Sequence, residues 1–249
     1  MRINKIIALI FVFLTSNAFA YNEDYGPFPN NYKVDRIAIT KLECQYYASD
    51  SEQGKAMFIF TSSKHDGTKL TVYCESNAYF VELSSGARIL LKKTRFSQYL
   101  SGGMTAYIAD LNQDNIPDYI IFAYGPATGH CIGAFVLSSG DKYKLTTITA
   151  LFPREDNFVY INKKPCFIHT SLCGVCHCKD NNGHNFWVYN LLMFDKDEMV
   201  INNSIHPEFP KTIWYSFKPN NKETTIITDK QKEELQKDSL KNIFSPTTN

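Results

Sequence analysis

Short runs of β-branched and aromatic residues recur from about residue 35 to residue 228, and they constrain the fold more than any other feature. Turn-forming residues separate the runs, and many strands at short spacing are typical of a sandwich, barrel or propeller. The 18 Phe and 15 Tyr residues also suit strand faces better than helices. The runs expected as strands are 56–60, 69–74, 79–83, 89–91, 105–109, 119–124, 158–161, 186–194 and 213–217. We therefore expect a mostly-β protein with antiparallel sheets in a small or incomplete propeller-like (or sandwich) arrangement.

One polar segment, residues 110–118, lies between two of these apolar runs and places oxygen-bearing side chains at its positions 1, 3, 5 and 9. Calcium prefers roughly six to eight oxygen ligands, and a tight loop of this pattern can supply them. The expected ligands are the side chains of Asp110, Asn112, Asp114 and Asp118 and the backbone carbonyl of Ile116. Asn115 stands at the turning point, and Asn tolerates a positive φ better than most residues. The alternative is an Asx-rich turn without a metal.

The segment is not an EF-hand, because its twelfth position is Ile121, inside an apolar strand-like run, where an EF-hand has glutamate. A strand–DxNxDxxxD–strand unit resembles instead the calcium loop of FG-GAP/VCBS-type repeats, found in integrin-like β-propellers and many exported bacterial proteins. The resemblance covers about residues 107–122. It implies a metal shell of Asp110, Asn112, Asp114, Ile116 and Asp118. Most members have Asp at the position of Asn112 and Gly at that of Asn115, and the resemblance leaves the function open.

A weak internal repeat agrees with a propeller-like arrangement. Residues 79–90 are similar to residues 134–145, and their Ser-Ser-Gly turns lie 54 residues apart. Residues 158–169 also echo the strands around the acidic segment but lack its aspartates, so no metal is expected there. A period of about 50 residues suits a four-stranded propeller blade. The alternative is chance similarity among short hairpins.

The first 20 residues have the pattern of a secretory signal peptide, with a basic start, an apolar run and Ala18-Phe-Ala20 as the expected cleavage site. No later stretch approaches about 18 apolar residues, so no membrane span is expected after its removal. The formal net charge of +1 argues against a nucleic-acid partner. We expect a secreted or periplasmic protein with a single β-rich domain over residues 21–227.

The C-terminal part changes to a helical pattern. Thr228-Asp-Lys-Gln231 has the form of a capping box, in which the Thr hydroxyl and the Gln side chain satisfy backbone amides. A helix is expected over residues 228–244. Its apolar side chains expected to face the β-rich domain are Leu235, Leu240, Ile243 and Phe244. Residues 245–249 are expected to be a disordered tail.

The seven cysteines are Cys44, Cys74, Cys131, Cys166, Cys173, Cys176 and Cys178. All are candidates for disulfides, because an exported chain meets an oxidising compartment, although an odd number leaves one over. Cys44 and Cys74 are a plausible pair. Four of the other five, Cys166, Cys173, Cys176 and Cys178, lie in a Cys-rich insertion expected over residues 166–184, together with three histidines. Zinc is an alternative there, since Cys173-x2-Cys176 and a nearby His are suitable ligand types.

A further alternative is haem, because Cys173-Gly-Val-Cys176-His177 resembles the attachment site of c-type cytochromes. The two thiols would then form thioethers and His177 would ligate the iron, with Met193 or Met199 as the distal ligand. The segment shows no helical pattern, unlike most c-type haem domains.

Catalytic residues are hard to assign from the sequence. His130 and Cys131 are adjacent, but neighbours in an extended chain point to opposite faces, so His130 is a poor base for Cys131. We therefore expect an exported, non-enzymatic, calcium-binding β-repeat protein that recognises a protein or a glycan. The alternatives are a c-type haem redox protein and a hydrolase on the same scaffold, for which no residue can be named.

Overall fold

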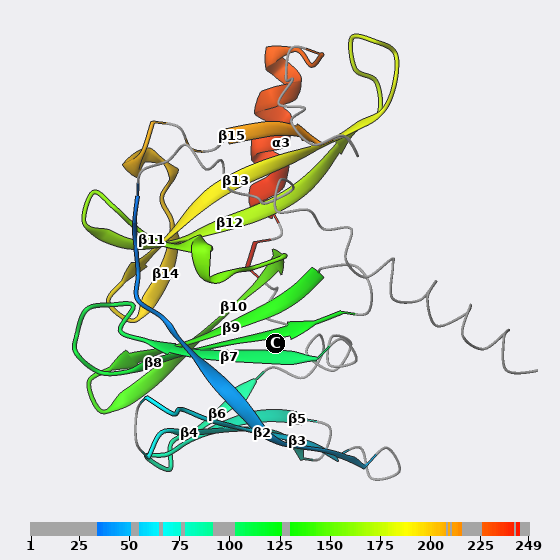
Figure 1. The fold of residues 1–249 in the computed structure, drawn as a ribbon. Helices are drawn as coiled ribbons and strands as arrows, with labels where there is room; N and C mark the ends of the chain where they lie inside the picture. The colour runs from blue at the N-terminus through cyan, green and yellow to red at the C-terminus, as the bar shows by residue number, and fades with distance from the viewer. Residues whose placement is uncertain are drawn as a thin grey trace, which may run out of the picture.

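The structure is a computed structural model of the 249-residue chain. The residues that it describes are 34–50, 55–64, 67–75, 78–91, 103–125, 130–207, 209, 211–215, 226–241 and 243–244. The predicted signal peptide and the tail at 245–249 lie outside this part of the chain. The prediction of a mostly-β fold with antiparallel sheets and one short C-terminal helix is confirmed (Figure 1).

The larger sheet has nine antiparallel strands. In spatial order they are β10 (Lys142–Leu151), β9 (His130–Ser139), β8 (Asp118–Tyr124), β7 (Met104–Ala109), β2 (Thr40–Asp50), β3 (Lys55–Thr61), β4 (Lys69–Glu75), β5 (Ala78–Leu83) and β6 (Arg88–Leu91). Strands β3 to β6 and strands β7 to β10 are two four-stranded meanders. The two edge strands β10 and β6 approach each other, so the sheet is bent nearly into a barrel.

Strand β2 joins the two meanders and makes the bend. Its first residues, Thr40 to Leu42, pair with β7, and the remainder pairs with β3 along the opposite edge. A register shift between Cys44 and Tyr46 interrupts the second ladder. An irregularity of this kind bends a strand and increases its twist, which turns one meander toward the other.

The two similar hairpins of the sequence are β5–β6 and β9–β10, and each is the last hairpin of its meander. Their Ser-Ser-Gly turns contain Gly86 and Gly140, with φ of 82° and 64°. Only glycine adopts such angles without steric cost, which accounts for the shared turn sequence.

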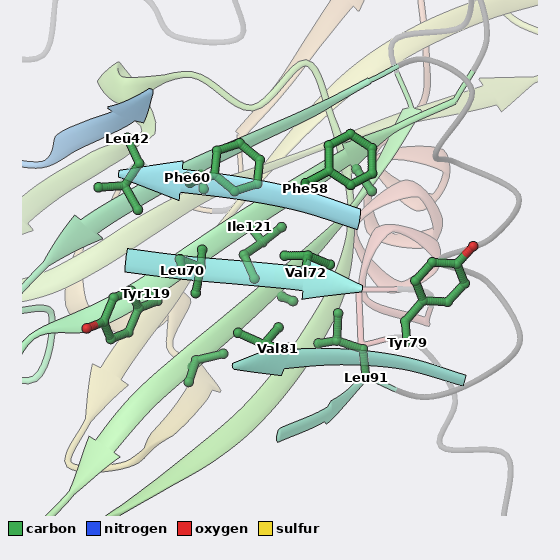
Figure 2. Close-up of a cluster of buried hydrophobic side chains, with 14 of the residues drawn as sticks. Leu42, Phe58, Phe60, Leu70, Val72, Tyr79, Val81, Leu91, Tyr119 and Ile121 are labelled. Atoms are coloured by element: carbon green, nitrogen blue, oxygen red, sulfur yellow. The ribbon is translucent and has the colours of Figure 1, made fainter. Parts of the chain in front are cut away.

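The inside of the bent sheet is filled by one apolar cluster (Figure 2). Alternate side chains of β5, Tyr79, Val81 and Leu83, point inward, as the two-residue period of a strand requires. Side chains from the other strands meet them: Leu42, Phe58, Phe60, Leu70, Val72, Leu91, Tyr119 and Ile121.

The smaller sheet packs against the outer face of β7 to β10. Its strands are β1 (Asp35–Arg36), β11 (Phe158–Ile161), β12 (Lys164–Val175), β13 (His184–Asp195) and β14 (Glu198–Ile201), with β15 (Lys211–Tyr215) also paired to β13. Two 3-10 turns, η3 (Glu155–Asn157) and η4 (Asn203–Ile205), flank it.

Aromatic rings fill the space between the two sheets. Phe122 and Phe135 of the larger sheet meet Phe158 and Phe167 of the smaller one, with ring centroids 5.0–6.5 Å apart. Strands β8 and β9 are therefore buried on both faces, which explains why their sequences are apolar almost without interruption.

The C-terminal helix α3 (Asp229–Lys241) packs on β12, β13 and β15 (Figure 1). The predicted capping box is confirmed: Gln231 N–H donates to Thr228 Oγ1 at 3.2 Å, and Thr228 N–H donates to Gln231 Oε1 at 2.8 Å. The predicted end at residue 244 is wrong. The helix stops at Lys241, and the chain continues along β10, where Thr149 N–H donates to the Ile243 carbonyl and Phe244 forms an isolated bridge with Ile148. Ile243 is buried as expected, whereas Phe244 is exposed.

Candidate functional site

The acidic segment 110–118 connects β7 to β8 as a tight hairpin, since Ala109 pairs with Asp118. The backbone wraps around the carboxylate of Asp110, which accepts hydrogen bonds from the N–H groups of Asp114 and Asn115, both at 3.0 Å. Asn115 has a φ of 66°, so the prediction that Asn could make the sharp turn is confirmed. Gln113 also has a positive φ, of 63°. The loop therefore closes as the sequence predicts.

Asp118 is used differently from the other aspartates, because its side chain is completely buried. One oxygen accepts from the N–H groups of Leu111 and Asn112, at 2.6 and 3.3 Å. The other accepts from the N–H and the hydroxyl of Ser138, at 2.7 and 2.9 Å. Three backbone N–H groups and one hydroxyl surround the carboxylate, so in this conformation Asp118 anchors the loop.

The environment of Asp118 raises the pKa of its carboxyl group to about 6. Burial is the main cause, since removal from water disfavours the charged form. The hydrogen bonds from Ser138, Leu111 and Asn112 act in the opposite direction and offset only part of this effect.

Ser138, near the end of β9, also holds the middle of the loop. Its hydroxyl also lies 2.8 Å from Asp114 Oδ2, so the Asp114 and Asp118 carboxylates share its one proton, and its carbonyl accepts from Asn112 Nδ2 at 2.9 Å. Ser138 was not among the predicted site residues, because it lies 20 positions after Asp118 on another strand. The only local signal is a buried serine at the end of an otherwise apolar strand.

The residues fit a calcium ion only in part. Asp114 is exposed, and Asp110, Asn112 and Ile116 are half-buried, so hard oxygen donors lie on the solvent side of the loop. The described part of the chain contains no group of three or more His, Cys, Asp or Glu side chains arranged to hold a metal ion. Four of the five expected ligands could therefore contribute to a calcium shell completed by water, and Asp118 does not fit.

The Cys-rich segment 166–184 is not an insertion. It forms most of β12, the turn after it and the first residue of β13, in a long hairpin of the smaller sheet. No disulfide joins Cys74, Cys131, Cys166, Cys173, Cys176 or Cys178 to another cysteine. Four of them, at 74, 131, 166 and 178, are buried, and burial raises the pKa of the thiols of Cys131, Cys166 and Cys178.

A bridge between Cys44 and Cys74 is incompatible with the strand register. Cys44 of β2 lies opposite Phe60 of β3, and Phe60 lies opposite Leu70 of β4. Cys74 is therefore two strands away from Cys44 and four residues further along β4 than the residue aligned with it. That displacement is on the order of 15 Å at normal strand spacings, whereas a disulfide needs Cα atoms within about 7 Å.

The structure also separates the groups of the haem alternative. Cys173 lies on β12 and packs with the cluster around Phe186, whereas Cys176 lies beyond the strand and is exposed. Met193 and Met199 are buried in two other clusters. The C-x-x-C-H string thus runs from the end of β12 into a bend at Cys176 and His177, with its two thiols in different environments, and neither methionine lies beside it.

A cavity of about 260 Å³ lies between the two sheets at the opposite end of β9 from the acidic loop. It is lined by His130, Cys131, Thr149, Ala150, Leu151, His169, Thr170, Ser171, Leu172, Cys173, Asp238 and Ser239. As predicted, the adjacent His130 and Cys131 have different environments, one exposed and the other buried. In the sequence His169 stands out only as one of the histidines among the cysteines of segment 166–184, and nothing marks Ser171.

Comparison of the chain with protein-family models, with curated proteins and with solved structures gives no match. None of the helices within the described residues has the length and apolar character needed to cross a membrane.

Proposed function

We propose that this protein is exported, that its loop 110–118 takes up one calcium ion as a structural element, and that it recognises a protein or a glycan. The observation that carries the calcium proposal is the closure of the loop around Asp110, with a positive φ at Asn115, as the resemblance to FG-GAP/VCBS-type loops implies. The leader-like sequence of residues 1–20 supports export.

Calcium would act on the charge of this loop. Asp110, Asp114 and Asp118 are three carboxylates within nine residues, and their negative charges repel one another. A divalent cation held by Asp110, Asn112, Asp114 and the Ile116 carbonyl would offset this repulsion. Asp118 would support that shell indirectly, by fixing the backbone of Leu111 and Asn112.

The test is thermal unfolding of the mature protein with calcium and with a chelator. Wild type should melt several degrees higher with calcium, and Asp114→Ala should melt at one lower temperature in both conditions. Asp141→Ala, an exposed aspartate in the neighbouring β9–β10 turn, should respond to calcium like wild type. Identical melting of wild type in both conditions would overturn the calcium proposal.

The variant Asp118→Asn distinguishes the structural role of Asp118 from the metal-binding role proposed for the other loop residues. Because Asp118 holds the loop through hydrogen bonds, this variant should be less stable in both conditions and should keep part of the calcium response. Export is tested separately by the intact mass of the secreted protein, which should begin at Tyr21.

A further inference from the structure

A belt of buried polar side chains crosses the interior where the helix and the two sheets meet. It contains the buried His169 of β12, Asn190 of β13 and Ser239 of α3, and the half-buried Ser171 of β12 borders it. Apolar clusters lie on either side of it, one around Phe167 and the other around Phe186 and Leu235. Buried polar groups stabilise a fold less than apolar ones would, so a polar belt through a core indicates a site.

His169 is held in one tautomer. Its side chain is 2% exposed, and Nε2 lies 2.6 Å from the Thr149 carbonyl, so Nε2 carries the proton and donates it. Nδ1 is then a bare acceptor, and Ser171 Oγ lies 3.5 Å from it. Burial lowers the pKa of His169 to about 4, which keeps the ring neutral at ordinary pH. The Ser171 hydroxyl has a second acceptor, the Ser239 carbonyl at 3.4 Å.

Backbone donors reach the same cavity from the edge of β12. The pairing of β12 with β11 ends at Phe167. Just beyond that point, on the same edge of β12, the Ile168 carbonyl accepts a hydrogen bond from Asn157 Nδ2. Because the backbone groups of every second residue point to the same edge, the N–H groups of Thr170 and Leu172 also face this side. Both residues line the cavity, and the buried Thr170 hydroxyl has no hydrogen-bond partner among the described residues.

From this geometry we propose that the cavity is an acyl-transfer site that hydrolyses small esters, with Ser171 as nucleophile and His169 as general base. The Thr149 carbonyl orients the imidazole and stabilises the imidazolium that forms. The Leu172 N–H is the oxyanion donor, in the position that the residue after the nucleophile commonly takes. The proposal goes beyond the calcium-binding function and makes this end of the protein an enzyme.

The reaction has two balanced steps. Ser171 Oγ forms a bond to the ester carbonyl carbon as its proton moves to His169 Nδ1, and the departing alkoxide takes that proton and leaves as an alcohol. Water then adds to the acyl carbon while giving a proton to Nδ1. The bond to Oγ breaks, Oγ recovers the proton, and the products are a carboxylic acid and the alcohol.

The size of the cavity limits the substrate. Its volume of about 260 Å³ is below the range of about 300–1,000 Å³ typical of drug-sized ligands. Ala150, Leu151 and Leu172 give it an apolar wall, which suits a short acyl chain such as acetyl or butyryl.

The decisive experiment is labelling of the purified mature protein with a fluorophosphonate probe, which reacts with an activated serine. Wild type should be labelled at Ser171, as identified by peptide mass, and should release p-nitrophenol from p-nitrophenyl acetate. Ser171→Ala, a small change at a half-buried position, should lose the label and at least 100-fold in rate, the lower end of the effect expected for such catalysis. Ser204→Ala, an exposed serine of η4, should match wild type.

His169→Gln adds a second check. It should lose labelling while the Ser171 hydroxyl is still present, and its melting curve shows whether it is folded. Absence of label on wild type, or equal label on Ser171→Ala, would overturn the proposal.

The cavity and the acidic loop lie at opposite ends of the ten-residue strand β9, on the order of 25 Å apart. Labelling that persists with chelator would therefore support this site independently of calcium.

Discussion

The carboxylate of Asp118 accepts hydrogen bonds from both the backbone N–H and the hydroxyl of Ser138, at 2.7 and 2.9 Å. This pair connects the start of β8 to the end of β9 and, through the N–H groups of Leu111 and Asn112, holds the acidic loop against the sheet. Asp118 therefore holds the loop on its buried side, while Asp110 and Asp114 lie on its solvent side.

Ser138→Ala should destabilise the fold by about 1–3 kcal/mol, because the change removes a hydroxyl donor from two carboxylates and one of them is buried. The free energy of unfolding from urea titration measures this. Ser139→Ala is the matched control, since the hydroxyl of Ser139 is exposed and bonds only Asp197 among the contacts described. Equal effects of the two changes would contradict the anchoring role.

The pKa of Asp118 predicts a pH dependence of stability. The folded-state pKa of about 6 lies above the unfolded value of about 3.9, so the folded protein binds the proton more tightly. The stabilisation is complete below about pH 4 and is lost as the pH rises to 6. Between about pH 4 and pH 7 wild type should lose about 3 kcal/mol relative to Asp118→Asn, a difference of two pKa units at ~1.4 kcal/mol each. A difference that does not change with pH would show that the hydrogen bonds offset burial completely.

Gly133→Ala should destabilise the fold by about 1–3 kcal/mol through overpacking. A Cβ at this position of β9 would lie 2.9 Å from a ring carbon of Phe122 and 3.2 Å from Ile148. The Phe122 ring cannot move away freely, because three other Phe rings surround it. Chemical denaturation measures the effect, and Gly140→Ala, which meets no atom but has a positive φ, separates crowding from backbone strain.

Thr228→Ala should cost about 1 kcal/mol, because the N–H of Gln231 loses its cap. Thr228→Ser keeps the hydroxyl and should retain most of the stability. Melting followed by circular dichroism compares the three proteins. If the alanine and serine variants melt together, the cap contributes nothing.

Many of the strands and the start of α3 could be predicted because their signals are local, whereas β2 and β12 were not among the expected runs. Alternation in β5 and the Thr228–Gln231 pair each lie within a few residues. The role of Asp118 could not, because Ser138 reaches it from another strand. The same applies to His169, whose tautomer depends on Thr149, 20 residues away in a different sheet. A pattern of aspartates shows which oxygens are near one another in the chain, and it does not show which of them the fold will use.

The double pairing of β2 has a consequence for how the chain folds. The two meanders are made of consecutive strands and can form through local contacts, but Thr40 to Leu42 must find partners at Ala106 to Ile108. Closing the loop between these two segments costs conformational entropy before their contacts can form, and non-local pairings of this kind slow folding. We therefore expect the bend of the larger sheet to form after its two meanders.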